Sequence, residues 1–400
     1  MKSDTDNKAC RVLVLGGYGH FGGRICRALA ADPNIRLIIA GRNIEAARAF
    51  AEQLATITGQ AWAATLAAAS PTSTSDPARP APEAAALDHT AGDLHEHLTR
   101  LQAEVVIHTG GPYQGQDYHV AQACLRAGAH YVDLADGREF VAGISGLNEQ
   151  ALKRGVLIVS GASTLPALSS AVVDRFKSEV ALLESIESSI APGQQTPRGL
   201  ATLEAVLSYC GKPFEMLERG QWVRVYGWQG IVSHTYPDFG TRWVAPCDVP
   251  DLALFAERYP GLHTLTFRAG LELKIMQAGM VLLAYLRRLG LVSDWARHAA
   301  WLKALSDPFD FLGSDVGGMH ITLAGRDAAG APKALTWNLV ARQGHGPEIP
   351  CIAAIVVARK LAAGRIAERG AMPCMGLMSL DEFDAAVRHL DIHWSVTDHA

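Results

Sequence analysis

The sequence predicts an α/β protein whose N-terminal part is a doubly wound parallel sheet. Three observations support this fold class. Short apolar runs alternate with helical patterns between residues 11 and 160, a cluster of glycines follows the first run, and from residue 184 onward apolar and polar residues alternate at period two. The second half is therefore expected to be an α+β domain containing an antiparallel sheet.

Composition excludes several classes of protein. Hydrophobic residues make up 49% of the 400 residues and charged residues 19%, which is typical of a globular chain with more than one domain. The net charge of −4 and the lack of a basic run argue against a nucleic-acid partner. The seven cysteines are odd in number and form no C-x-x-C motif, so we expect free thiols and no metal site.

No segment of the sequence has the pattern of a secretory signal or a membrane span. The N-terminus is polar and then only briefly apolar, so a cytoplasmic location is expected. The longest apolar stretch, IMQAGMVLLAYL at 275–286, is too short to cross a bilayer and is expected to be a buried helix. The alternative is a surface contact with a membrane through residues 271–292, because Arg287 and Arg288 follow the stretch.

The first apolar run leads into the glycine cluster of VLVLGGYGHFGGRICRAL, residues 12–29. Residues 11–15 form the expected strand, and Phe21, Ile25 and Leu29 recur at helical spacing. A strand, a tight glycine turn and a helix in this order form the context in which a glycine-rich sequence binds a dinucleotide. The cluster is therefore interpreted as a phosphate-binding loop rather than an ordinary turn.

Each glycine of the cluster has an expected role. Gly17 permits the turn, Gly19 lets the backbone approach a pyrophosphate, and Gly22 allows the helix to pack near the strand. The amide groups and the positive dipole end at the helix start then face the phosphates. The expected cofactor site also includes the residues between these glycines, which are Tyr18, His20 and Phe21.

The second strand, residues 35–40, ends in Gly41, Arg42 and Asn43. A cofactor with a free ribose 2′-hydroxyl usually has an acid about 20 residues beyond the glycines. The first acid here is Glu45, and Arg42 stands where a 2′-phosphate would lie. We therefore expect NADP rather than NAD, the alternative being an Arg42 that pairs with a surface carboxylate. Asn43 is expected to cap the next helix.

The third strand follows a segment rich in Ala, Ser and Pro at 68–82. This segment is interpreted as a flexible insertion without chemistry. The strand ends at Asp88, which is expected either to contact the adenine side of the cofactor or to belong to a turn.

The fourth strand, residues 104–108, leads into a second glycine-rich turn. In a doubly wound sheet, ligands lie beyond the carboxyl ends of the strands. Gly110, Gly111 and Pro112 fit a backbone that passes under a flat ring, so we include them in the expected cofactor site. A Gly-Pro turn with nothing bound is the alternative.

Three side chains near the expected cleft between the domains are candidates for catalysis. Tyr113 follows the glycines where a nicotinamide would lie, and its phenol could donate a proton or support the cofactor. Asp133 and Asp136 follow the fifth strand, and two carboxylates three residues apart could bind an amine or exchange protons. The alternatives are core packing for Tyr113, and helix capping and an ion pair with Arg138 for the carboxylates.

The expected domains are a dinucleotide-binding domain at 1–165, an α+β substrate and dimerisation domain at 166–345, and C-terminal helices at 346–400 that pack back on the first domain. Within the second domain, residues 319–323 and 335–339 alternate in polarity about a turn, which predicts an antiparallel hairpin.

Several segments together resemble the saccharopine dehydrogenase-like (saccharopine reductase-type) NADP-binding oxidoreductases. In the first half they are GGYGHFGG, AGRN, HTGGPYQGQDYHVAQACLRAGAHYVDLADGREFV and SGASTLPALSSAVVD. In the second half they are YGWQG, CDVPDL, RAGLEL, GSDVGGMHITLAG and GPEIPCIAAIVVARKLAAG, so the resemblance covers nearly the whole chain. It implies a Rossmann domain, an inserted α+β domain and a C-terminal stretch that returns to the first domain.

The expected function is an NADP-dependent oxidoreductase that acts on a C=O, C=N or C=C group of a small substrate. Residues 184–345 hold 15 basic and 15 acidic residues, dispersed, and six of the eight tryptophans, which favours an apolar substrate over saccharopine itself. Packing of these tryptophans in the core is the alternative. The competing function is a non-catalytic NADP(H)-binding sensor or scaffold. A homodimer through the second domain's sheet is expected from fold analogy.

Overall fold

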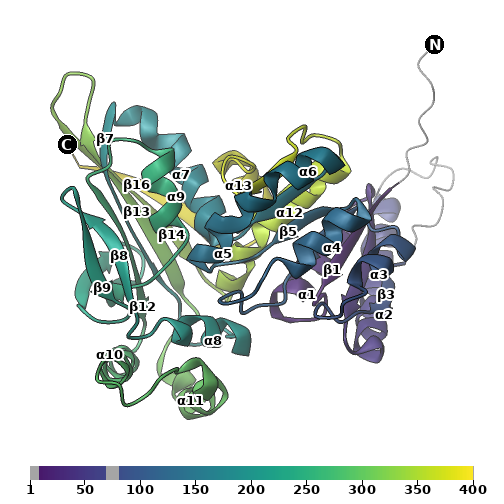
Figure 1. The fold of residues 1–400 in the computed structure, drawn as a ribbon, viewed down its shortest axis with the longest axis horizontal. Helices are drawn as coiled ribbons and strands as arrows, with labels where there is room; N and C mark the ends of the chain where they lie inside the picture. Colours follow the sequence, from purple (N-terminus) through teal and green to yellow (C-terminus); the bar gives the residue numbers. More distant parts are fainter. Residues whose placement is uncertain (1–8, 69–80, 400) are drawn as a thin grey trace.

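The computed structural model describes residues 9–68 and 81–399, and two sheets organise it (Figure 1). In this part of the chain the first sheet has seven strands, all parallel, in the order β15-β6-β5-β4-β1-β2-β3. The strands are β1 (Cys10–Leu15), β2 (Ile35–Gly41), β3 (Glu83–Ala86), β4 (Val105–His108), β5 (His130–Asp133), β6 (Leu157–Ser160) and β15 (Gly370–Pro373). The predicted doubly wound parallel sheet is confirmed.

Helices cover both faces of this sheet, because its central strands are apolar on both sides. Val12 and Val14 of β1 belong to one buried cluster, and Leu13 and Leu15 belong to the other. The first cluster lies under α1 (His20–Ala30), α2 (Ile44–Ala68) and α12 (Ile349–Ala362). The second lies under α3 (Leu94–Arg100), α4 (His119–Ala127) and α6 (Asn148–Arg154), and α5 (Arg138–Gly143) follows β5.

The second sheet is mixed and has nine strands among the described residues. The strands β10-β11-β12-β7-β13-β14-β16 form its path, and the β8–β9 hairpin pairs with β12. Only β7 and β12 pair in parallel within this described sheet. The strands are β7 (Leu182–Ala191), β8 (Pro213–Glu218), β9 (Gln221–Tyr226), β10 (Val232–Tyr236), β11 (Gly240–Pro246), β12 (Thr264–Leu271), β13 (Gly317–Arg326), β14 (Pro332–Ala341) and β16 (Ile392–His399).

The predicted hairpin is β13 and β14, whose inward residues Met319, Ile321, Leu335 and Trp337 are almost fully buried. The helices of the second domain are α7 (Ser169–Phe176), α8 (Leu200–Ser208), α9 (Asp251–Arg258), α10 (Lys274–Arg288) and α11 (Ala299–Ser306). Short helical turns lie at Ile144–Leu147, Thr164–Leu168, Lys177–Glu179, Ala296–His298, Asp307–Leu312 and Gly346–Glu348.

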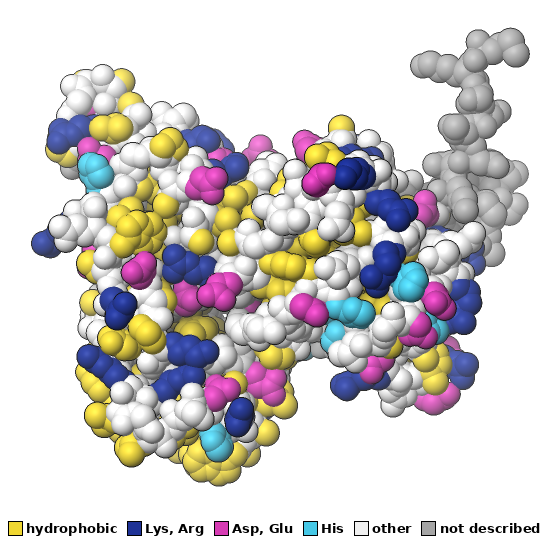
Figure 2. Space-filling view, viewed as in Figure 1, with side chains coloured by type: hydrophobic (Ala, Val, Ile, Leu, Met, Phe, Trp, Pro, Cys, Tyr) yellow, Lys and Arg dark blue, Asp and Glu magenta, His cyan; other side chains and the backbone are white. Residues whose placement is uncertain are grey.

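The expectation that residues 275–286 form a buried helix is wrong in part: the helix forms, but one side of it is exposed. In α10, Gln277 and Ala284 are buried, but Ile275 is 66% and Leu282 59% exposed. An apolar edge therefore remains on the lobe that carries α10 and α11, where Figure 2 shows many apolar side chains. Across the described residues, no helix is both long enough and apolar enough to cross a membrane.

The C-terminal segment joins the two sheets. Helix α12 packs against α1, β15 extends the first sheet, and α13 (Leu380–Val387) packs on α12. Ser379 and Glu382 form the expected capping box at the start of α13. The last strand, β16, pairs with β14 in the second sheet, where helices alone were expected. Its alternation of Ile392, Trp394 and Val396 with polar residues is the period of a strand.

Candidate functional site

The glycine loop after β1 brings the first turn of α1 against the end of the strand. A Cβ atom on Gly22 would lie 2.1 Å from the carbonyl oxygen of Gly16, so only glycine permits this approach. Gly19 occupies the position just before α1, and its N–H donates to the Gly16 oxygen at 2.8 Å. The packing role predicted for Gly22 agrees with this geometry.

The turn itself depends on a different glycine from the one expected. Gly16 has a φ of +79°, whereas Gly17 is not in the left-handed region. A Cβ on Gly17 would lie 2.9 Å from the Val14 oxygen, and the Gly17 N–H donates to the Ala40 oxygen at 3.1 Å. Gly17 is therefore needed for close packing, and the sequence interpretation that it makes the turn is corrected.

The first amides of α1 are available to a ligand. In an α-helix the first N–H groups have no carbonyl acceptor one turn earlier, and this applies to His20, Phe21 and Gly22. The first turn contains no acidic residue that would neutralise the positive end of the helix dipole. The loop therefore has the features of an anion-binding site and fits a phosphate group, as expected from its sequence.

His20 lies where the second domain meets this loop. Its Nδ1 lies 3.3 Å from Nη1 of Arg24, whose Nε forms an ion pair with Glu348 at 2.9 Å. A Cβ on Gly199, at the start of α8, would lie 3.8 Å from the Cβ of His20. Burial, and then the Arg24 charge, lower the pKa of His20. The imidazole is thus held between α1 and α8.

The end of β2 forms the part of the expected cofactor site that would hold the adenosine. The ring of Tyr18 covers Gly41, and its hydroxyl accepts the N–H of Asn43 at 3.0 Å. The Asn43 side chain accepts the amides of Glu45 and Ala46, so the predicted cap of α2 is confirmed. Arg42 is exposed and, within residues 9–68 and 81–399, has no hydrogen bond or ion pair. Its guanidinium is free to bind an anion.

Asp88 lies beyond the end of β3, next to this side of the sheet. Its Oδ1 accepts the N–H of Thr90 at 3.0 Å and the Thr90 hydroxyl at 2.8 Å. Asp88 therefore has the geometry of a turn residue, which was one of its two predicted roles, and its carboxylate is still exposed. Most of the insertion predicted at 68–82 falls outside the described residues.

The second glycine turn follows β4 at the same end of the sheet. A Cβ on Gly110 would lie 2.9 Å from Nε2 of His108, so this position also requires glycine. The Gln116 side chain donates to the carbonyl oxygens of Gly110 at 3.0 Å and Pro112 at 2.7 Å. Gly111 and Pro112 thereby form a fixed, narrow segment beside the phosphate loop. The three residues lie where the sequence placed them, and their contact with a ring stays a prediction.

Tyr113 does not open onto a cleft. Its side chain is 4% exposed, and its hydroxyl donates to the His108 carbonyl at 2.7 Å. Burial raises the pKa of Tyr113 well above its usual value. The hydroxyl is committed to the backbone, so this geometry favours the packing alternative over a proton donor.

Asp133 is also buried, with no exposed surface. Its Oδ1 accepts the N–H of Ala135 at 2.9 Å, the Ser160 hydroxyl at 3.0 Å and the N–H of Gly161 at 2.8 Å. Burial raises the pKa of Asp133 to about 6, although these hydrogen bonds oppose the change. The carboxylate ties the end of β5 to the end of β6.

Asp136 differs from Asp133 because its side chain is exposed. Gln114 donates to Oδ1 of Asp136 at 3.0 Å, and the surrounding protein raises the pKa of the carboxyl. Figure 2 shows the outline of the molecule indented between the two lobes, and α1 and α8 border this indentation in Figure 1.

The second domain brings Tyr209 and Cys247 to the neighbourhood of Asp136. The Tyr209 hydroxyl and the Cys247 sulfur lie 2.8 Å apart. Burial and the Cys247 thiol raise the pKa of Tyr209, and the charge of Asp136 adds to this effect. Sequence reasoning missed this pair, which follows Asp136 by more than 70 residues and lies in no motif that indicates chemistry.

Arg138 connects the two domains at this point. Its guanidinium donates to Asp248 at 3.2 Å and to the carbonyl oxygens of Glu215 at 3.0 Å and Leu252 at 3.3 Å. The alternative in which Arg138 pairs with Asp133 or Asp136 is therefore wrong. Arg138 fixes the position of α5, and hence of Asp136, relative to the second domain.

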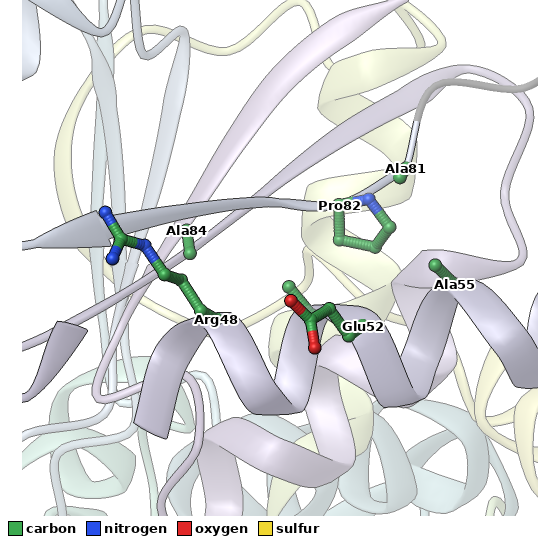
Figure 3. Close-up of a pocket in the computed structure, with 7 residues that line it drawn as sticks. Arg48, Glu52, Ala55, Ala81, Pro82 and Ala84 are labelled. Atoms are coloured by element: carbon green, nitrogen blue, oxygen red, sulfur yellow. The ribbon is translucent and has the colours of Figure 1, made fainter. Parts of the chain in front are cut away.

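Two other features do not contribute to this site. A surface cavity of about 270 Å³ lies between α2 and the start of β3. Its lining side chains, Arg48, Glu52 and small apolar residues, are drawn in Figure 3. The cavity lies at the outer edge of the sheet. The tryptophans of the second domain do not gather in one place: Trp228, Trp295 and Trp337 are buried, and Trp222 and Trp301 are exposed. They give no support to an apolar substrate.

All seven cysteines are free thiols, as expected, and six of them are buried. In the described residues, no group of three or more His, Cys, Asp or Glu side chains is arranged to hold a metal ion.

Comparisons with known proteins agree with the fold. The yeast saccharopine dehydrogenase (L-Glu forming) of Saccharomyces cerevisiae is similar over 98% of this chain and 100% of its own, with a TM-score of 0.66 and 16% identity. This chain is also weakly similar to an amine dehydrogenase from Mycobacterium smegmatis, with a TM-score of 0.44 and 11% identity over 93% of this chain and 95% of that one. This similarity supports no argument. No curated protein sequence matches the chain significantly.

Part of the chain also matches the model of a protein domain family. Residues 12–159 match the model of the saccharopine dehydrogenase NADP binding domain. This segment runs from the first strand to the sixth and contains both glycine turns and Arg42. The prediction of NADP as the cofactor is confirmed at the level of this domain family. Residues 12–159 are therefore similar to the saccharopine dehydrogenase NADP binding domains.

Proposed function

We propose that the protein is an NADP-dependent oxidoreductase that transfers a hydride to or from a C=O, C=N or C=C group of a small substrate. The observation that carries this proposal is the glycine cradle, in which Gly22 contacts Gly16 and the first amides of α1 stay free. Arg42, free at the end of β2, supports a cofactor with a 2′-phosphate. The match of residues 12–159 to an NADP-binding domain family supports the same assignment.

The chain's own residues divide the work between binding and proton transfer. The bound nicotinamide would supply the hydride. The amides of α1 hold the diphosphate, and the segment Gly110–Pro112 restricts the space beside it. Reduction of a carbonyl or imine also needs a proton at the oxygen or nitrogen. Among the three predicted candidates, Asp136 is the exposed one, and desolvation raises the pKa of its carboxyl, which is the direction that a proton donor needs.

Tyr113 and Asp133 serve as positioning residues in this proposal. Their polar atoms bind the backbone around the carboxyl ends of β4, β5 and β6. Tyr209, on the second domain, is near enough to Asp136 for the carboxylate charge to raise its pKa, so a substrate bound beside Asp136 would lie close to both domains. Three points stay predictions: which of carbonyl, imine and enoyl compounds is the substrate, the cytoplasmic location, and the homodimer.

Replacement of Gly22 should weaken cofactor binding. Gly22→Ala places a Cβ against the Gly16 oxygen, and relief of this overlap displaces the first turn of α1. We expect NADPH binding to weaken by about 10- to 100-fold, from about 1–3 kcal/mol of strain. Gly23→Ala is the matched control, because its Cβ would meet no atom closer than 3.5 Å. Fluorescence titration with NADPH would compare the two variants, and thermal melts would show that both are folded. Equal NADPH affinity of both variants would contradict a phosphate-binding role for the glycine loop.

Arg42→Ala should separate the two nicotinamide cofactors. A charge-assisted hydrogen bond contributes about 1.5–3 kcal/mol, so loss of the guanidinium should weaken NADPH binding by about 10- to 100-fold and leave NADH binding unchanged. Arg48→Ala is the control, since Arg48 is exposed on α2 and, among the described residues, its ion pair is with Glu45 alone. Equal affinity of the unmodified protein for NADPH and NADH would contradict the role of Arg42.

Turnover should depend on Asp136. NADPH oxidation with a panel of carbonyl, imine and enoyl compounds tests the reaction, and Asp136→Asn should lower kcat by about 100-fold or more on any substrate found. Glu139→Gln, a neighbouring exposed acid, should leave kcat unchanged. Wild-type turnover by the Asp136 variant would eliminate this proton donor. Tight NADPH binding without turnover of any compound would favour the sensor.

Asp133 should govern stability rather than turnover. Its pKa rises from 3.8 to about 6 on folding, so the folded state prefers the protonated carboxyl. The free energy of unfolding should therefore fall by about 3 kcal/mol as the pH rises from about 4 to about 6. Asp133→Asn keeps one acceptor oxygen and removes the charge, so this fall should be missing from the variant. Urea unfolding across this pH range measures the difference, and identical profiles would refute the assignment.

A further inference from the structure

The ends of β2 and β3 bring opposite charges together beside the expected 2′-phosphate. The two strands are parallel neighbours with Gly41 opposite Ala86, and the N–H of Leu87 donates to the Gly41 oxygen at 3.0 Å. Arg42 follows Gly41 by one residue and Asp88 follows Ala86 by two, so both leave adjacent strand ends, and the Arg42 charge acts on the Asp88 carboxyl. Both side chains are exposed.

The carboxylate of Asp88 is fixed in this place. Thr90 donates to it through both its amide and its hydroxyl, and these bonds lower the pKa of Asp88. Asp88 is therefore ionised over the whole physiological range. A fixed negative charge next to Arg42 attracts the guanidinium and repels a phosphate, so it opposes the binding that Arg42 favours.

His89 stands between these charges and the second glycine turn. Its Cε1 would lie 3.3 Å from a Cβ on Gly110, and its ring centre lies 5.3 Å from that of His108. The titratable and charged groups that face it are Asp88, Arg42, His119 and His108. Burial is the largest of the effects that lower the pKa of His89, so the imidazole is neutral in the free protein near pH 7.

We propose that Asp88 and His89 set the strength and the pH dependence of 2′-phosphate binding. The inference rests on the proposed function and goes beyond it, because it assigns part of the cofactor selectivity to the loop after β3. Asp88 weakens the site for a 2′-phosphate. His89 takes up a proton when the phosphate dianion binds nearby, which replaces part of the attraction that Asp88 removes.

Adenosine 2′,5′-bisphosphate and ADP are the probes, because only the first carries a 2′-phosphate and neither needs turnover. Calorimetry at pH 8 should show that Asp88→Asn tightens the 2′,5′-bisphosphate by about three- to tenfold and changes ADP by less than about twofold. Glu96→Gln, an exposed acid on α3, is the charge-matched control and should change neither.

Proton uptake tests His89 separately. Titrations at pH 7 in buffers of different ionisation enthalpy should show protons taken up with the 2′,5′-bisphosphate. The uptake should fall in His89→Gln, where only the phosphate's own ionisation, with a pKa of about 6, remains. Unchanged affinity in Asp88→Asn, or unchanged uptake in His89→Gln, would overturn the inference and leave the cofactor assignment intact. Failure of either probe to bind the unmodified protein would instead overturn both.

Discussion

The contact between Gly22 and the Gly16 carbonyl is the constraint on which the rest of the site depends. It lets α1 begin directly at the carboxyl end of β1, so that the positive end of the helix and its free amides face the same edge of the sheet as Arg42 and Gly110. A side chain at this position would move the helix start away from the strand. The phosphate site would then lose both its amides and its alignment with the neighbouring strand ends.

The second domain completes this edge from the opposite side. Gly199 lies against His20, and Arg138 connects α5 to the loop that carries Asp248. Tyr209 and Cys247 therefore lie near Asp136 because of contacts between domains rather than contacts along the chain. In the proposed function the site is shared: the first domain would supply the groups for the cofactor, and the second would supply residues near Asp136.

The first six strands, the hairpin and the caps at Asn43 and Ser379 could be predicted because local patterns determine them. The two adjacent glycines at 16 and 17 could not be assigned, since their backbone angles depend on the packing of α1. Equally, nothing near Tyr113 in the sequence indicates that its hydroxyl binds the His108 carbonyl. Strand β16 was missed although its residues alternate in polarity, and every residue of it after Ile392 is exposed. The burial of α10 was overestimated because its apolar residues continue around the helix.

Helix α12 has a consequence for movement between the two sheets. Residues 351–358 of this helix are buried, and the single apolar cluster that contains them includes residues from both sheets. Wide hinge opening between the domains would expose this cluster to water, at about 25 cal/mol for each Å² uncovered. Separation of the two sheets is therefore opposed wherever it would uncover residues of this shared cluster.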